Sequence, residues 1–161
     1  MTWSLKISNG DLAKGYDNNL EVVRGSEKVV QDLMCWIRHP VGTDPMNPDL
    51  GSLIEYGEQG KTYMINKEMV VLPEEYEDLV VSEINRLIRY YQSYQGMRIE
   101  QEINQFGRIV TYDQDEIINN FNIDYIKNYD TLYISVNLET ISGELYRLNI
   151  PIQNEATVRG I

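Results

Sequence analysis

The sequence predicts an α+β fold in which two main helices pack on a small antiparallel sheet that ends in a C-terminal β-hairpin. Apolar residues recur at helical spacing in residues 26–38 and 73–96, and they alternate with polar residues in two segments near the C-terminus. Helices and antiparallel strands that are segregated along a chain are typical of this class. The chain has 161 residues, enough for one core, so we expect a single domain over residues 1–161.

The N-terminal residues 1–19 are expected to form an arm or an edge strand. Residues 3–7 alternate in polarity and predict a short strand, and residues 20–24 predict another. Between them, residues 17–19 read Asp-Asn-Asn, which is a turn-forming combination.

The first helix is predicted from Ser26, a good N-cap residue, to Arg38, shortly before the helix-breaking Pro40. Cys35 lies in this apolar stretch, so we expect a buried, unreactive thiol. The predicted apolar face of the helix comprises Val29, Val30, Leu33, Trp36 and Ile37.

The second helix is predicted to begin at Pro73 and to run for about 20 residues to a C-terminal cap at Gly96. Acidic residues follow Pro73 directly, where they suit the positive end of a helix dipole. The predicted buried stripe comprises Leu79, Val80, Ile84, Leu87, Ile88 and Tyr91.

The segment after this helix predicts a strand over residues 108–112. Asp113 and Glu116 have the spacing of a capping box, which predicts a short helix over residues 114–121.

A hairpin is expected next, because residues 132–139 and 144–152 alternate clearly. A two-residue turn would place polar residues opposite the apolar face, whereas a three-residue loop pairs Leu138 with Tyr146. We therefore predict a loop over residues 141–143, with Gly143 left-handed at a bulge. Pro151 cannot donate a hydrogen bond, so the last strand should lie at an edge.

Composition excludes several classes of function. The net charge of −11 argues against nucleic-acid binding. No run of about 18 apolar residues occurs, so no membrane span is expected. The first residues do not combine a basic and an apolar stretch, so we expect no secretory signal and synthesis in a cytoplasm.

Enzymatic and metal sites find little support in the sequence, so we expect no catalytic residues, no cofactor and no metal. His39 is the only histidine and Cys35 the only cysteine, which is too few for a usual zinc site. A nucleophilic site would also have to use His39, which stands directly before the helix-ending Pro40. Calcium-loop and phosphate-loop patterns fail at their required positions. Carboxylates are numerous, but no pair stands out as a hydrolase pair.

The segment from Gln31 to Ser52 resembles the sheath-initiator family of contractile phage-tail baseplates, the small wedge subunit sometimes labelled lysozyme-like. A glutamine-containing helix is followed by a glycine-containing turn, an Asn-Pro-Asp-Leu-Gly segment, a long helix and a hairpin. The resemblance covers roughly residues 20–152. Many members carry Glu-Pro-Arg after the long helix, where this chain has Gly-Met-Arg. The residues that match the family pattern are Gln31, Gly42, Asn47, Pro48, Gly51 and Arg98.

The resemblance implies a structural protein of the tail baseplate in the virion, assembled in the host cytoplasm. It would template the first ring of sheath by exchanging strands with the tail sheath protein, and it would contact other wedge subunits and tail tube or hub proteins. The terminal hairpin would supply the edge for β-augmentation. A peptidoglycan hydrolase and a cytoplasmic adaptor with this fold are the alternatives. The expected exchange interface comprises Tyr133, Ser135, Asn137, Tyr146, Leu148 and Ile150.

Overall fold

The α+β fold class is confirmed by the computed structural model, which describes residues 3–8, 11–39, 41–52, 54–56, 62–65, 73–128 and 131–153. The helices are α1 (Gly25–Arg38) and α2 (Pro73–Phe106). The three long strands are β7 (Ile118–Asn128), β8 (Thr131–Thr140) and β9 (Leu145–Gln153). The short strands are β1 (Ser4–Leu5), β2 (Ile7–Ser8), β3 (Asp11–Leu12), β4 (Val22–Val23), β5 (Ile54–Tyr56) and β6 (Thr62–Ile65).

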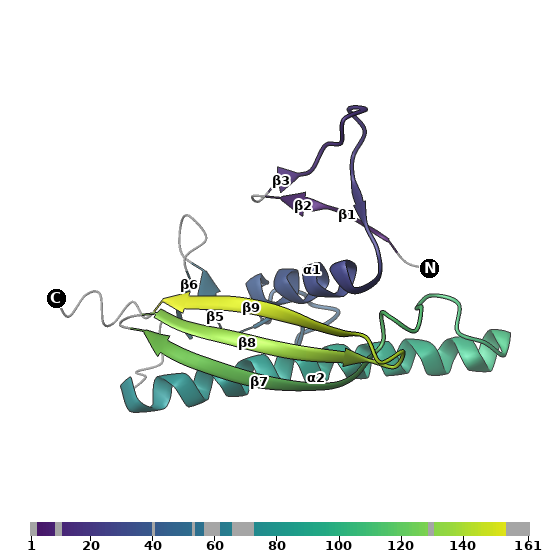
Figure 1. Ribbon diagram of the computed structural model, residues 1–161. Coiled ribbons are helices and arrows are strands. Elements are labelled where there is room, and N and C mark those ends of the chain that lie inside the picture. Colours follow the sequence, from purple (N-terminus) through teal and green to yellow (C-terminus); the bar gives the residue numbers. More distant parts are fainter. Residues whose placement is uncertain are drawn as a thin grey trace.

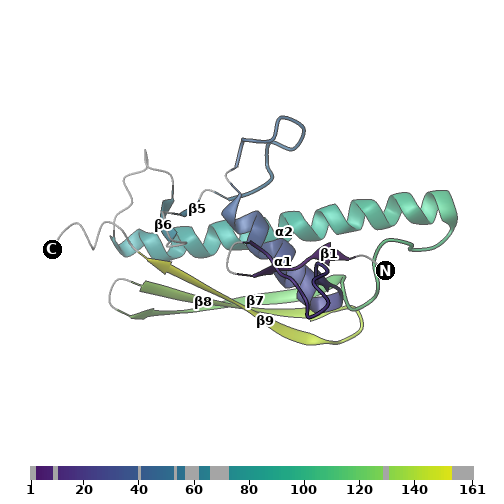
Figure 2. The same cartoon turned by 90° about the horizontal axis from the view of Figure 1, so that it is seen from above.

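The long strands form an antiparallel sheet in the order β7-β8-β9 (Figure 1). Both helices lie on the same side of this sheet, as the view from above shows (Figure 2). This arrangement leaves the other face of the sheet open and makes β7 and β9 the two edge strands.

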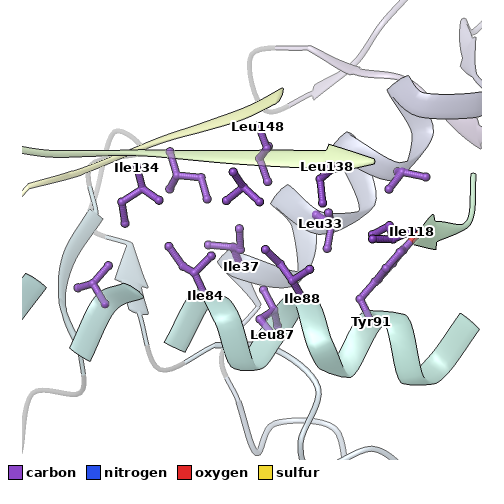
Figure 3. Packing of buried hydrophobic residues seen from close by; sticks show 14 of the residues in the cluster. Leu33, Ile37, Ile84, Leu87, Ile88, Tyr91, Ile118, Ile134, Leu138 and Leu148 are labelled. Atoms are coloured by element: carbon purple, nitrogen blue, oxygen red, sulfur yellow. The ribbon is translucent and has the colours of Figure 1, made fainter. Parts of the chain in front are cut away.

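The core fills the space between the helices and one face of the sheet (Figure 3). The period-two alternation of β8 sends every second side chain into this core. The predicted apolar faces of both helices are confirmed, with Val30, Trp36 and Leu79 packing at the margin. The fully buried members include Leu33, Ile37, Ile84, Leu87, Ile88, Ile134 and Leu138.

The predicted register of the hairpin is confirmed. Leu138 pairs with Tyr146 and Val136 with Leu148, and residues 141–143 form the loop. Gly143 has a φ of 86°, the left-handed conformation that glycine adopts without steric cost. Pro151 lies in the edge strand β9, as expected.

Two expectations for α1 are wrong. The N-cap is Arg24 rather than Ser26, and no side chain next to it in sequence caps the helix. Glu116 instead accepts a hydrogen bond from the N–H of Gly25 at 3.4 Å, so the cap comes from a segment distant in sequence. Cys35 is exposed rather than buried, because it lies on the side of the helix opposite Leu33 and Ile37.

The second helix is longer than expected. It continues through Gly96, which is exposed, and ends at Phe106, where Gly107 has a φ of 71° and donates to the carbonyl of Ile103. Gly96 therefore is not the C-terminal cap; Gly107 takes that role. The acidic side chains expected to match the helix dipole partly fall on residues 73–76, whose side chains lie outside the described part.

The expectations for residues 108–121 are also wrong. No strand forms over residues 108–112, and the helix over 114–121 is only a turn that leads into β7. The spacing of Asp113 and Glu116 was informative nonetheless, because the N–H of Asp113 donates to the Glu116 carboxylate at 3.3 Å. The turn stops there because Ile118 joins the sheet opposite Thr140.

The N-terminal residues form an arm of short antiparallel pairings. The expected strands over 3–7 and 20–24 are partly confirmed, since β1 pairs with β4. An additional strand, β3, pairs with β2, and the expected turn at residues 17–19 is present. Figure 1 shows that this arm projects away from the sheet and helices. No helix in the described ranges combines the length and apolar character of a membrane span.

Candidate functional site

The six residues expected to form the exchange interface lie on two different faces of the sheet. Tyr133, Ser135 and Asn137 belong to the open face, and the side chain of Tyr133 is 50% exposed. Leu148 and Ile150 belong to the core, with 3% and 1% exposure. Tyr146 packs partly buried against that core. Side chains from these six positions therefore do not make one contact surface; what they share is the pair of strands β8 and β9.

The open face of the sheet is covered with cross-strand polar contacts. Arg147 donates to the side-chain oxygen of Asn137 at 2.9 Å, and Asn137 donates to Asp124 at 3.4 Å. Ser135 donates to Asn149 at 3.3 Å. Each of these contacts joins neighbouring strands, so they stabilise the sheet, while Ile126, Tyr133 and Leu145 on the same face are exposed apolar residues.

The outer edge of β9 carries backbone groups that point away from β8. The N–H of Thr140 donates to the carbonyl of Glu144 at 3.0 Å, which fixes the alternation of hydrogen-bonded pairs along β8 and β9. Pro151, which has no N–H, lies opposite Tyr133 in a pair that makes no β8–β9 hydrogen bonds, consistent with this alternation. No strand in the described ranges pairs with this edge. The residues whose backbone groups point away from β8 are Leu145, Arg147, Asn149, Pro151 and Gln153.

The N-terminal arm carries apolar side chains that are exposed in the described part of the chain. Exposed large apolar residues on the arm are Trp3, Leu5, Ile7, Leu12, Leu20 and Val22. A monomeric soluble protein rarely leaves so many apolar residues uncovered within one short segment. The arm is therefore a second surface suited to contact with a partner.

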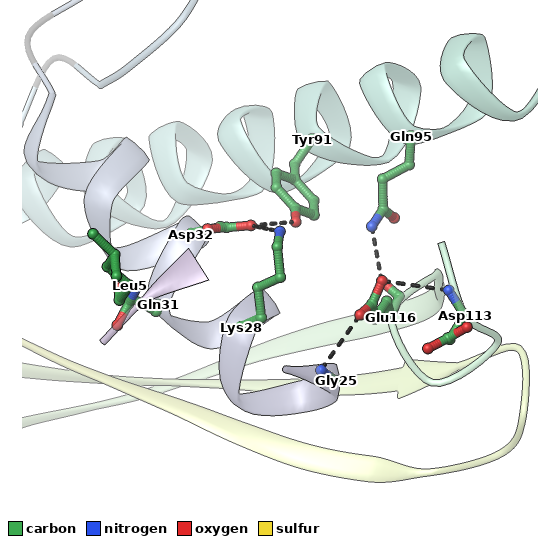
Figure 4. A network of polar contacts seen from close by, with 9 residues as sticks. All are labelled: Leu5, Gly25, Lys28, Gln31, Asp32, Tyr91, Gln95, Asp113 and Glu116. Carbon is green, nitrogen blue, oxygen red and sulfur yellow. Dashed lines mark hydrogen bonds and ion pairs between the residues drawn. The ribbon is translucent and has the colours of Figure 1, made fainter. Parts of the chain in front are cut away.

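Gln31 holds this arm on α1. Its side-chain nitrogen donates to the carbonyl of Leu5 at 2.8 Å (Figure 4). Its side-chain oxygen accepts from the N–H of Ile7 at 2.9 Å. A single amide thus pairs with an extended backbone at positions i and i+2, as a neighbouring strand would. The structure gives Gln31, expected as a motif residue, a definite physical role.

The other glycine and proline positions of the motif shape the loop over residues 41–52. The N–H of Gly42 donates to the carbonyl of Pro48 at 3.1 Å, which closes the loop. Gly51 has a φ of 100°, and a Cβ there would lie 2.3 Å from the carbonyl oxygen of His39. Asn47 donates from its side chain to Asp44 at 3.2 Å. Gly42, Asn47, Pro48 and Gly51 therefore lie in one compact loop.

This loop is fixed to α2 by Arg86. The guanidinium donates to the carbonyls of Gly51 at 2.8 Å and Asp49 at 3.3 Å while it forms an ion pair with the buried Glu83. Hydrogen bonding to Glu83 is the main cause that raises the pKa of Arg86. The loop is thus held in one conformation by a permanent charge on a helix.

Arg98, the remaining motif residue, does not follow the long helix as expected. It lies within α2, where it pairs with Glu102 at 3.3 Å. Glu102 also accepts hydrogen bonds from the hydroxyl of Thr111 and from the N–H groups of Thr111 and Val110. These bonds, led by the Thr111 hydroxyl, lower the pKa of Glu102 to about 2. Arg98 therefore belongs to a contact that folds residues 110–111 onto α2, away from the loop over 41–52.

A buried polar junction joins α1, α2 and the start of β7 (Figure 4). Gln95 on α2 donates to the carbonyl of Glu116 at 2.8 Å and accepts from the N–H of Ile118 at 3.1 Å. The carboxylate of Glu116 in turn accepts from Gly25, at the start of α1. Gln95 and Glu116 are each 1% exposed. Sequence reasoning missed Gln95, because nothing near it in the chain indicates the partner that it contacts.

An aromatic cluster lies where the arm meets the helices. The ring of Trp36 lies 4.9 Å from Tyr91 and 5.8 Å from Tyr94, both in edge-on geometry. With Trp3 and Tyr112, these rings line a cleft of about 390 Å³. Burial is the main cause that raises the pKa of Tyr112 to about 12, so its hydroxyl remains protonated at neutral pH.

The described residues contain no group of three or more histidine, cysteine, aspartate or glutamate side chains that could hold a metal ion. His39 lies 3.0 Å from the hydroxyl of Thr43 and belongs to the turn after α1. The features that the described residues do present are two strand edges, an apolar arm and a loop fixed to α2.

Comparison with known proteins gives no family for this chain, since neither a family model nor a curated protein matches it.

Proposed function

We propose that this chain is a structural subunit of a contractile-tail baseplate wedge that templates the first ring of tail sheath by strand exchange. The observation that carries the proposal is the outer edge of β9 at Leu145, Arg147 and Asn149, with which no described strand pairs, although β6 contacts β9. A strand added there would form main-chain hydrogen bonds with Leu145, Arg147 and Asn149. The resemblance of residues 20–152 to the sheath-initiator family supplies the identity of the partner.

The anchored arm supports the same proposal. Its uncovered apolar side chains give a contact surface for neighbouring wedge, tube or hub subunits. Gln31 holds the arm against α1, so the arm is positioned before a partner arrives. Pre-positioning lowers the cost in conformational entropy of ordering the arm during assembly.

Co-assembly tests the proposal. The purified chain is mixed with the sheath protein of the same genome and with its tube and wedge proteins, and the products are imaged by negative-stain electron microscopy. We expect sheath rings only when this chain is present. Sheath that assembles equally well without the chain would reject the proposal, and the hydrolase and adaptor hypotheses would replace it.

A pair of proline variants locates the edge that is used. Asn149→Pro removes an outward N–H from β9, while Tyr125→Pro removes one from β7 at the other side of the sheet. Loss of rings with Asn149→Pro alone is the expected result. Normal rings with Asn149→Pro, in a variant that retains its melting temperature, would contradict strand exchange at β9.

A further inference from the structure

The second edge of the sheet, along β7, lies beside α2. The even-numbered residues of β8 form hydrogen-bonded pairs with β9, so the backbone groups of its odd-numbered residues point towards β7. The hydrogen-bonded pairs between β7 and β8 therefore join even-numbered residues of β7 to odd-numbered residues of β8. The backbone groups of Phe121, Ile123 and Tyr125 therefore point outward, away from β8. Within the described ranges, no strand pairs with them.

Side-chain amides already occupy the start of this edge. The side-chain nitrogen of Gln92 donates to the carbonyls of Ile118 at 3.3 Å and Asn119 at 3.4 Å. The side-chain oxygen of Asn120 accepts from the N–H of Phe121 at 2.9 Å. A primary amide has the hydrogen-bonding groups of a peptide bond. The Gln92 contacts therefore show that carbonyl groups at the start of this edge accept amide donors from outside the sheet.

A groove of about 450 Å³ runs between this edge and α2. Ser82, Asn85 and Arg89 line it from the helix, and Asn122 and Ile123 line it from the strand. None of its lining residues carries a carboxylate, although the chain as a whole has a net charge of −11. The groove is therefore a local exception to the acidic character of the protein.

Arg89 provides the positive charge of the groove. Its Nε donates to the side-chain oxygen of Asn85 at 3.2 Å, which orients the guanidinium. Among the described residues, Arg89 forms no ion pair. An oriented guanidinium favours a planar carboxylate as its partner.

We propose that the groove between α2 and β7 binds an extended segment of a partner protein, which adds to β7 as a further strand and places an acidic side chain opposite Arg89. The β-bulge at Asn119 interrupts the ladder and the N–H of Phe121 already bonds to Asn120, so the added strand bonds to Ile123 and Tyr125. This site lies at the edge opposite β9. It goes beyond the proposed baseplate role and does not depend on it.

A fluorescent peptide tests the site directly. The probe has the sequence Thr-Val-Thr-Glu-Thr-Val-Thr, and the control replaces its glutamate with lysine. We expect saturable fluorescence anisotropy with the full chain and a dissociation constant below about 1 mM. We also expect protection of the Ile123 and Tyr125 amides from hydrogen exchange. No saturation, or equal binding of the lysine control, would overturn the proposal.

Three variants separate this site from the other edge. Arg89→Gln should weaken binding of the acidic probe by about two- to fivefold and should not weaken binding of the lysine probe. Tyr125→Pro should abolish binding, because it removes an outward N–H while the ladder to β8 remains. Asn149→Pro, on β9, should bind the probe normally. Unchanged binding by Tyr125→Pro, or loss with Asn149→Pro, would overturn the proposal.

Self-association is the remaining occupant to test. Sedimentation of the wild-type chain and of Tyr125→Pro over a range of concentrations measures it. We expect both to sediment alike. A dimer that Tyr125→Pro dissociates would identify a second copy as the occupant and would overturn the assignment to a separate acidic partner.

Discussion

The start of β7 and the N-terminal arm are held by the same chemistry in opposite surroundings. Gln95 and Gln31 each bridge a carbonyl and the N–H two residues further on. Gln95 is buried among α1, α2 and the sheet, whereas Gln31 holds an exposed segment. Burial therefore determines whether a side chain that pairs with backbone stabilises the whole fold or only positions a local segment.

Apolar residues show the same contrast. Leu132, Ile134 and Leu148 on the sheet are at most 3% exposed, while Leu12 on the arm is 44% exposed. The body is therefore stabilised by its own core, and the arm has little of its own surface to bury. We expect the body to unfold cooperatively and the arm to open at lower free-energy cost.

The largest expected effect comes from placing a charge in the core. Leu148→Asp should lower the free energy of unfolding by about 3–5 kcal/mol, because it buries an unpaired carboxylate. Leu12→Asp is the matched change on the arm and should alter it by less than about 0.5 kcal/mol. Chemical denaturation followed by circular dichroism measures both. Equal effects would show that the arm belongs to the cooperative core.

Removing the buried amide is the next largest change. Gln95→Ala should lower the free energy of unfolding by about 2–4 kcal/mol, because the carbonyl of Glu116 and the N–H of Ile118 lose their partner in a buried place. Gln92→Ala, one turn earlier on α2, removes longer and more exposed contacts and serves as the control. A loss no larger than that of the control would show that water replaces Gln95 at no cost.

The C-terminal hairpin could be predicted because its sequence determines it locally. Four apolar residues of β8 alternate without interruption, and only one loop length places them opposite the apolar residues of β9. Gly143 then supplies the left-handed residue that this loop needs. Pattern, register and turn chemistry agree, so local information suffices.

The segment before it could not be predicted in the same way. β7 contains the sequence Ile-Asn-Asn-Phe-Asn-Ile-Asp, in which the bulge at Asn119 interrupts the period of two. Most of its side chains are exposed, so they carry little apolar signal. The end of α2 was misplaced because the exposed Gly96 is tolerated within a helix of 34 residues.

Some residues of the candidate site could be identified from the sequence and others could not. Gln31 was identified only through the family resemblance, whereas the loop glycines could be identified from the sequence, because close backbone approach at Gly51 requires that residue type. The roles of Gln95, Arg86 and Arg89 could not, since each depends on a partner brought close only by the tertiary fold. The exchange residues were assigned to one surface because the sequence gives alternation but not which face a partner meets.

The carboxylate of Glu102 should contribute to stability in a pH-dependent way. Its pKa is lowered from 4.5 to about 2 by hydrogen bonds from residues 110–111 and by Arg98. A lowered pKa in the folded state stabilises the fold above about pH 4.5, and this contribution disappears as the pH falls towards about 2. The stability difference between wild type and Glu102→Gln should therefore shrink over that range. A difference that stays constant between about pH 7 and pH 3 would contradict the role of the carboxylate. Gln31 and Gln95 do not titrate, so their variants should show no such trend.

The smallest change in global stability is expected where the arm meets α1. Gln31→Ala removes two hydrogen bonds, but the groups that it leaves behind lie in an exposed segment and can bond to water. We expect the free energy of unfolding to fall by less than about 1 kcal/mol. Hydrogen exchange at Ile7 should nevertheless accelerate strongly, because its N–H loses its acceptor. Gln31→Glu is an informative companion, since it retains the acceptor for Ile7 and removes the donor to Leu5.

If the arm acts only after it is positioned, Gln31→Ala should slow ring formation while the folded body remains intact. Unchanged exchange at Ile7 would show that the pairing with β3 alone holds the arm.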